Sequence, residues 1–197
     1  MTMNRILVGA FVLAVAASAN AITFSNVIIT SAPLSNGSSF ATNGNAISFN
    51  LPNAIVGDGV GVRAGTLNIQ YDVDAVALAN GVGANVGVVA LGTGAIAFRE
   101  SVIELDNLGN EIGGIIGSTS FNFNASTPMY YSTTIALTQA VRYFRVKKSF
   151  TLVAPDSQAF DLAAVAIVNQ NVQVVPEPGT IAALSLGAAA LLRRRRK

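Results

Sequence analysis

Apolar and polar side chains alternate along the stretch from Thr66 to Ala75. The apolar set is Leu67, Ile69, Tyr71, Val73 and Ala75, and the polar set between them is Asn68, Gln70, Asp72 and Asp74. Because successive side chains of a strand point to opposite faces, this pattern predicts a strand with one face in a core and the other in water. A chain built from such strands must bury its sheet faces against one another.

Further candidate strands share this alternation or a β-branched, apolar composition. They are residues 22–30, 46–51, 85–91, 95–106, 111–116, 120–124, 130–138, 141–153 and 160–174. Turn residues predict loops at 31–45 and 52–65 and a hairpin connection at 107–110. The alanine-rich segment 161–168 leaves a short helix as the alternative to a strand. We predict an all-β domain, an antiparallel β-sandwich or jelly roll.

The first 21 residues have the three parts of a secretory signal peptide. Arg5 supplies the positive charge, an apolar run follows from Ile6 to Ala17, and Ala19-Asn20-Ala21 forms a small-x-small cleavage site. The run is too short for a transmembrane helix. We expect export by the general secretory route and cleavage after Ala21.

Three different parts follow one another at the other end of the chain. Pro176-Glu177-Pro178 is stiff and extended, because each proline fixes its own φ and disfavours helix at the residue before it. The uncharged run from Ile181 to Leu192 favours a short membrane helix, and Arg193, Arg194, Arg195 and Arg196 with Lys197 form a basic stop on the cytoplasmic side. This helix is about 18 Å long against a hydrocarbon core of about 30 Å, which is short for a permanent anchor.

This tail resembles the PEP-CTERM sorting signal of Gram-negative bacteria, whose members end in Pro-Glu-Pro, a hydrophobic helix and an arginine cluster. The resemblance covers Val175 to Lys197 and assigns no fold or activity to the rest of the chain. It implies recognition by an exosortase in the inner membrane, removal of the tail, and delivery to the cell surface, the outer membrane or the extracellular matrix. It also implies a link to exopolysaccharide and biofilm. The alternative is a plain C-terminal membrane anchor.

Composition excludes several classes of site in the body of the chain. Half of the 12 lysines and arginines lie in the two ends, so the body is slightly acidic and nucleic acid is not an expected partner. The chain has no cysteine, histidine or tryptophan, which removes disulfides, thiolate metal sites, the usual general base and the best sugar-stacking ring. We therefore expect no enzyme, no cofactor and no metal centre.

Four clusters in the body are candidate sites. Asp72 and Asp74 share a strand face and could hold a cation, and Glu100, Glu104 and Asp106 form a second acidic face that would more often aid solubility than catalyse glycoside hydrolysis. Arg142, Arg145, Lys147 and Lys148 are expected to pair across strands with these acids, or to bind an anionic polysaccharide. The glycines from Gly81 to Gly87 resemble a dinucleotide loop, but the β-branched residues after them favour turns.

The sequence thus predicts a signal peptide at 1–21, an exported β domain at 22–174 and a sorting tail at 175–197. The expected function is a structural or adhesive protein of the cell surface or matrix. The alternative is a carbohydrate-binding module. Expected partners are the secretion machinery, the exosortase, the membrane during a transient stage, and exopolysaccharide.

Overall fold

A computed structural model describes residues 22–155 and 160–175, and all of its regular secondary structure is β-strand. Two predicted segments lie outside the described residues. They are the signal peptide with Ala19 and Ala21, and the tail with the Pro-Glu-Pro motif, the short helix and Arg193 to Arg196. Within the part of the chain that is described, no helix is long and apolar enough to cross a membrane.

Nine strands make up the body. They are β1 (Thr23–Thr30), β2 (Ser39–Asn43), β3 (Ala46–Asn50), β4 (Ile55–Gly57), β5 (Ala64–Leu91), β6 (Ala95–Leu105), β7 (Glu111–Asn124), β8 (Tyr130–Val153) and β9 (Leu162–Val174). They form one sheet in the order β2-β3-β9-β5-β8-β6-β7, with β1 also paired to β5 and β4 to β9. Every pairing is antiparallel, which confirms the predicted all-β, antiparallel class.

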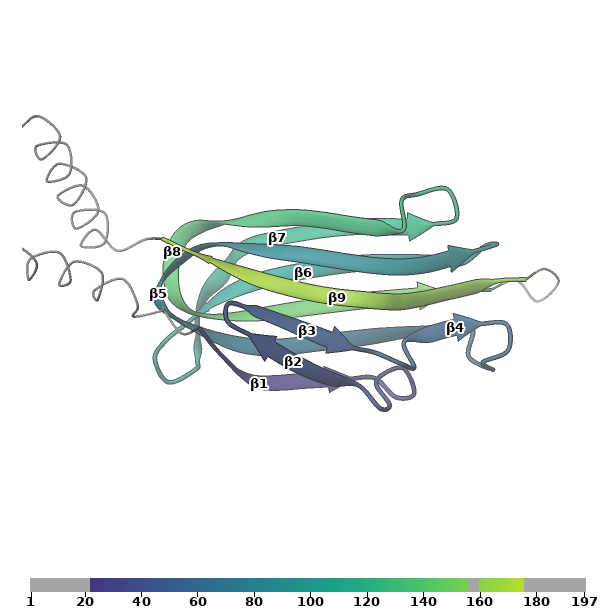
Figure 1. The fold of residues 1–197 in the computed structure, drawn as a ribbon, viewed down its shortest axis with the longest axis horizontal. Helices are drawn as coiled ribbons and strands as arrows, with labels where there is room; N and C mark the ends of the chain where they lie inside the picture. The colour runs from purple at the N-terminus through teal and green to yellow at the C-terminus, as the bar shows by residue number, and fades with distance from the viewer. Residues whose placement is uncertain (1–21, 156–159, 176–197) are drawn as a thin grey trace, which may run out of the picture.

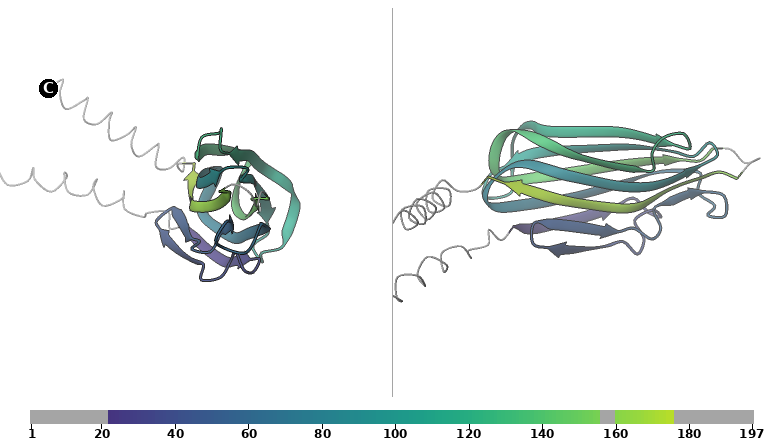
Figure 2. Two further views of the ribbon diagram at one scale, coloured as in Figure 1. Left: turned by 90° about the vertical axis from the view of Figure 1, so that its right-hand side faces the viewer. Right: turned by 45° about the horizontal axis from the view of Figure 1, so that its top comes forward.

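The two longest strands form a ladder that bends back on itself (Figure 1). Residues 64–74 of β5 pair with 143–153 of β8, whereas residues 81–87 of β5 pair with 130–136 of β8. Between these halves the register shifts, and Val76 has a φ of 48° at this bend. Seen along its length, the sheet curls around the space between the two halves of the ladder (Figure 2).

The hydrophobic core fills that space. Tyr71, Phe98, Phe144 and Phe150 are among its largest side chains, and each is fully buried. Phe98 and Phe150 are directly opposite each other on β6 and β8, with stacked rings whose centroids are 5.0 Å apart. Burial of one such side chain is worth about 1.5–3 kcal/mol, so the inward faces of these strands supply much of the driving force for folding.

Several predicted boundaries were wrong. The segment between the predicted strands 66–75 and 85–91 is strand rather than turn, and the predicted pairs 111–116 with 120–124 and 130–138 with 141–153 are each one continuous strand. The predicted loops at 31–45 and 52–65 contain β2 and β4. The predicted strand 160–174 is confirmed as β9, and the alternative of a short helix at 161–168 is wrong. Predicted strands 22–30, 46–51 and 95–106 are confirmed to within a residue or two at each end, as is the connection at 107–110.

The glycines that looked like turns lie in the middle of β5. Gly83 is paired with Asn171 of β9 on one side and Thr134 of β8 on the other. A Cβ on Gly83 would overlap the side chain of Asn171, which folds across the strand at this point. Glycine is therefore present to allow a close approach rather than to form a turn.

Both ends of the described body lie beside the bend. Thr23 is opposite Asp74, and Val174 is opposite Ala79. The β6–β7 turn is at the same end, because Glu104 is opposite Phe144 and Leu105 is opposite Glu111. We call this the bend end; it is at the left in Figure 1. The β7–β8 connection and the end of β5 lie at the opposite end.

Candidate functional site

A polar groove with a volume of about 770 Å³ crosses the outer face of β5, β8, β6 and β7. Its lining includes one exposed apolar side chain, Ile115 of β7, and the other outward side chains are mostly hydroxyls and amides. They are Asn68 and Gln70 from β5, Ser149 and Lys147 from β8, Arg99 and Ser101 from β6, and Ser118 and Ser120 from β7. The groove is thus built by four strands that follow one another in the chain but are ordered differently in the sheet, as β5-β8-β6-β7.

Strand register explains why these side chains meet. Asn68, Ser149, Arg99 and Ser120 are successive cross-strand partners and form one row. Gln70, Lys147, Ser101 and Ser118 form the next row, two residues along each strand. Since directly opposite residues on a sheet share a face, the two rows make a continuous polar surface.

Two cations, Lys147 and Arg99, face outward into this groove and differ in their surroundings, whereas the side chain of Lys148 in the same lining is buried. Lys147 Nζ lies 2.7 Å from a carboxylate oxygen of Glu111, so its charge is largely matched. Arg99 is exposed, and none of the described carboxylates lies within ion-pair distance of it. The guanidinium of Arg99 is therefore available to an anionic ligand in the groove.

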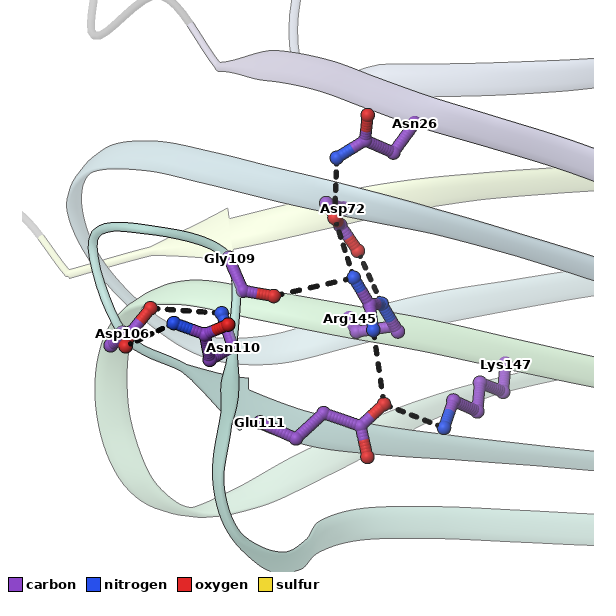
Figure 3. A network of polar contacts seen from close by, with 8 residues as sticks. All are labelled: Asn26, Asp72, Asp106, Gly109, Asn110, Glu111, Arg145 and Lys147. Atoms are coloured by element: carbon purple, nitrogen blue, oxygen red, sulfur yellow. Dashed lines mark hydrogen bonds and ion pairs between the residues drawn. The ribbon is translucent and has the colours of Figure 1, made fainter.

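An ion network extends from Lys147 of the groove to Glu111, Arg145 and Asp72 (Figure 3). Arg145 donates two hydrogen bonds to Asp72, from Nε to Oδ1 at 2.6 Å and from Nη2 to Oδ2 at 2.9 Å. Its Nη1 also donates to Glu111 at 3.1 Å, and Glu111 in turn binds Lys147. Bidentate guanidinium–carboxylate geometry fixes both side chains, so this network holds β5, β8 and the start of β7 in register.

Local backbone features complete the network. A register shift between Ser25 and Ile28 marks a bulge in β1, where Asn26 has a φ of 49° and donates to Asp72 Oδ2 at 2.8 Å. Asparagine tolerates such a left-handed backbone better than most residues. In the β6–β7 turn, Asp106 accepts hydrogen bonds from the backbone N–H groups of Leu108 and Asn110, both at 2.8 Å. The turn is thereby ordered against Arg145, which also donates to Gly109 O at 3.4 Å.

The network decides the charge state of Asp72. Burial disfavours its ionised form, since the residue is only 5% exposed. Hydrogen bonds from Arg145 and Asn26 outweigh that effect, so the pKa of Asp72 is below its ordinary value. Hydrogen bonds from Lys147 and Arg145 likewise lower the pKa of Glu111. Both carboxylates are therefore ionised at neutral pH.

A second polar cluster lies beneath the groove, inside the core. Lys148 pairs with Glu100, Gln170 donates to the other oxygen of Glu100, and the Tyr71 hydroxyl donates to Gln170 Oε1. All four side chains are buried. Burial, with a smaller effect of the Glu100 charge, raises the pKa of Tyr71 well above its ordinary value, and burial lowers that of Lys148. The cluster joins β6 and β8 to β9 and is out of reach of a ligand in the groove.

The predicted pairing of the basic cluster with the two acidic sets is confirmed for Arg142, Arg145 and Lys148, whereas Lys147 pairs with Glu111, which was in neither set. Arg142 binds Asp74, Arg145 binds Asp72, and Lys147 and Lys148 bind Glu111 and Glu100. Asp72 and Asp74, considered for a cation, are each held by an arginine instead.

The predicted acidic face does not exist as one surface. Glu100 points into the core, Glu104 accepts a hydrogen bond from Gln139, and Asp106 orders the β6–β7 turn. These three carboxylates therefore have separate structural partners and do not converge on a common site.

Arg99 and the serines of the groove were not among the predicted site residues. A signal was present in residues 95–102, where Ile96, Phe98 and Val102 set the inward parity. Arg99 and Ser101 then fall on the outward face. That parity does not reveal which strands are neighbours, so the rows of the groove became visible only with the register.

Comparison with known proteins bears first on the tail. The family model of the PEP-CTERM protein-sorting motif matches residues 174–197, which confirms the resemblance seen in the sequence. The motif implies export and sorting by an exosortase to the cell surface or exterior of a Gram-negative bacterium. No curated protein matches the chain in sequence.

Several solved structures resemble the body loosely. The carbohydrate-binding module TmCBM61, solved with β-1,4-galactotriose, superimposes with a TM-score of 0.33 and 13% identity over 77% of this chain and 87% of that one. A structure of carbohydrate-binding modules from the β-sandwich superfamily superimposes with a TM-score of 0.35 and 10% identity. The match covers 74% of this chain and 55% of that one. The enzymatically active domain of a bacteriophage CBA120 tailspike protein superimposes with a TM-score of 0.32 and 12% identity. The match covers 78% of this chain and 19% of that one. These superpositions are too loose to assign a ligand or an activity to this chain.

Proposed function

We propose that the protein is an adhesive component of the cell surface or extracellular matrix, where its groove binds polysaccharide. In this proposal the signal peptide at 1–21 starts export, the body at 22–174 folds as a two-layered, sandwich-like domain, and the tail at 175–197 holds the chain in the inner membrane. Pro176, Glu177 and Pro178 form the processing motif, and the arginines from Arg193 to Arg196 stop the tail at the cytoplasmic side.

The observation that carries the ligand proposal is the chemistry of the groove. Its two rows present hydroxyl and amide groups from Asn68, Gln70 and four serines, which can donate to and accept from sugar hydroxyls. Arg99 adds a cation without a carboxylate partner among the described residues. The lining contains no aromatic side chain, so binding would rest on hydrogen bonds and charge. An acidic polysaccharide meets both requirements.

Glycan arrays test the ligand proposal directly. The mature exported protein should bind acidic polysaccharides better than neutral ones, with and without calcium, and added salt should weaken the binding. Arg99→Ala should lower the affinity about tenfold, as expected for the loss of one charge-assisted contact. Arg142→Ala is the matched control, because Arg142 is exposed but lies at the bend end and pairs with Asp74. Equal binding by both variants would place the ligand elsewhere, and no binding at all would leave a purely structural role.

The sorting proposal needs a separate test in a host that has the exosortase. Glu177→Ala should leave unprocessed chain in the membrane, and deletion of residues 193–197 should weaken its retention there. Cell fractionation with intact-mass measurement gives the readout. A wild-type protein that keeps residues 193–197 at its final location would identify the tail as a plain anchor.

The proposed role requires no catalytic residue. The mature protein should therefore leave bound polysaccharide intact, and the chain length of a recovered glycan is the measurement. Cleavage that is lost on changing one carboxylate would identify a hydrolase instead.

A further inference from the structure

The bend end carries both chain termini of the body. Ile22 precedes β1 at this end, and the backbone N–H of Val175 donates to Leu78 O at 2.8 Å, next to the bend in β5. Only residues 176–180 separate Val175 from the apolar run that starts at Ile181. The backbone from Val175 to Ile181 therefore spans at most about 22 Å. When that run lies in a bilayer, the bend end is therefore held close to the lipid surface.

Apolar side chains are exposed at this same end. Val76 is 44% exposed and Leu78 is 50% exposed at the bend of β5, and Leu108 is 81% exposed at the tip of the β6–β7 turn. Leu108 borders a small pocket together with Asp74 and Tyr143, which places the turn beside the bend. Figure 1 shows the turn and the bend at one end of the elongated body.

The backbone presents these side chains in fixed positions. Asp106 orders the turn that bears Leu108, and Asp74 Oδ1 accepts a 3.0 Å hydrogen bond from the backbone N–H of Val76. Val76 has a left-handed φ of 48°, which is unfavourable for a β-branched residue. The charge of Asp74 is matched by Arg142, with Nε 2.9 Å from Oδ1. The end therefore combines ordered apolar tips with a paired charge.

We propose that the bend end is a membrane-contacting surface, with Val76, Leu78 and Leu108 entering the interfacial layer of the bilayer that holds the tail. This inference rests on the membrane stage in the proposed function. Lipid is the occupant because the tail brings the surface to the bilayer and because the exposed groups are apolar. The contact would orient the body upright and hold residues 176–178 at the membrane surface.

The chain has no cysteine, so single-cysteine labelling can test this contact on the full-length protein. An environment-sensitive fluorophore is attached at Asn107→Cys, beside Leu108, or at Ala125→Cys, in the β7–β8 connection at the opposite end; both positions are exposed. The protein is incorporated into phosphatidylcholine vesicles that contain nitroxide-labelled lipid. The probe at position 107 should shift to the blue and be quenched, while the probe at 125 should keep its aqueous spectrum.

Two test variants and one control assign the contact to the named side chains. On the Asn107→Cys background, Leu78→Ser and Leu108→Ser should each lower the quenching. Leu91→Ser, at an exposed apolar residue of the opposite end, should leave it unchanged. Circular dichroism of each variant shows whether the fold is intact, so a loss of quenching in a folded Leu108→Ser protein supports the proposal.

Other outcomes would overturn it. A vesicle-bound chain with an aqueous probe at 107 would refute the lipid contact alone, whereas a chain that does not bind vesicles would refute the membrane stage of the tail as well. Equal quenching at 107 and 125 would mean that the body lies flat on the membrane. A blue shift that disappears when each vesicle holds one chain would identify a second copy as the occupant.

Discussion

Lys147 and Lys148 are neighbours in the sequence and lie in opposite environments. The side chain of Lys147 is 40% exposed on the outer face of β8 and binds Glu111, whereas that of Lys148 is fully buried and binds Glu100. The partners differ in the same way, since Glu111 is exposed and Glu100 is in the core.

The difference between these two pairs is one of dielectric environment rather than of chemistry. An exposed ion pair is screened by water and contributes little to stability. A buried pair has lost its hydration, so each charge depends on the other, and removal of one partner is costly. Two lysines that are adjacent on one strand therefore form ion pairs of very different importance for stability: the exposed pair of Lys147 contributes little, and loss of the buried partner of Lys148 is costly.

Glu100→Ala should have the largest effect. It leaves the Lys148 ammonium buried without its partner and should cost about 3–5 kcal/mol in the free energy of unfolding. Chemical denaturation of this variant and of Glu111→Ala tests the contrast, because Glu111→Ala should cost far less. Replacing both inner charges, with Glu100→Leu and Lys148→Met, should restore most of the stability. Equal losses for the two alanine variants would contradict the comparison.

Asp72→Asn should cost about 2 kcal/mol at neutral pH, since it weakens charge-assisted hydrogen bonds to Arg145. The pKa of Asp72 is lowered by folding, so its contribution is present above the unfolded pKa and is lost as pH falls through the folded pKa. Unfolding free energies of wild type and variant should therefore begin to converge as the pH falls below about 4, and should meet only below the lowered pKa of folded Asp72. A difference that persists in acid would mean that the effect is one of packing.

Tyr71→Phe tests the hydrogen bonding of the inner cluster without changing its charges. It removes the donor to Gln170 Oε1 and should cost about 1 kcal/mol, less than Glu100→Ala because both ions stay paired. Thermal denaturation provides the measurement. A loss as large as that of Glu100→Ala would show that the hydroxyl is essential to the pair.

Lys147→Ala should have the smallest effect, roughly 0.2–1 kcal/mol, and salt should reduce the difference from wild type. Repeating the unfolding measurement at low and high ionic strength checks both expectations. A cost that is independent of salt would show that Lys147 stabilises through its aliphatic stem rather than its charge.

The alternation of side chains predicted the faces of single strands well. Leu67, Ile69, Tyr71 and Val73 are all buried, as expected. The same parity also contained the inner cluster, because Lys148 lies in the inward series of Phe144, Val146, Phe150 and Leu152. The cluster was not predicted, because Lys148 adjoins Lys147 in the sequence and both were assigned to one basic cluster. Asp72 was expected to be in water. It is buried because Asn26 and the β6–β7 turn, both distant in the sequence, lie next to Asp72 and its partner Arg145.

Long-range pairing was beyond a single sequence. Local sequence patterns predict turns at Gly81 and Gly83. The reason for glycine at these positions is long-range, because the side chains that lie over them come from β9 and β8. The groove depends on the register of four strands, so its residues could be placed on a face but not brought together. The tail, by contrast, was predictable because its three parts are consecutive.

The place of β9 in the sheet has a consequence for the timing of export. It is the last strand in the chain, yet it lies between β3 and β5. A chain that crosses the membrane with its N-terminus first cannot complete the sheet until residue 174 has emerged, so until then β3 and the second half of β5 have open edges. By that moment the tail is the next segment in the translocation channel. In the proposed route of export, completion of the fold would therefore coincide with arrival of the tail at the membrane, which would limit the time in which an incomplete sheet could aggregate.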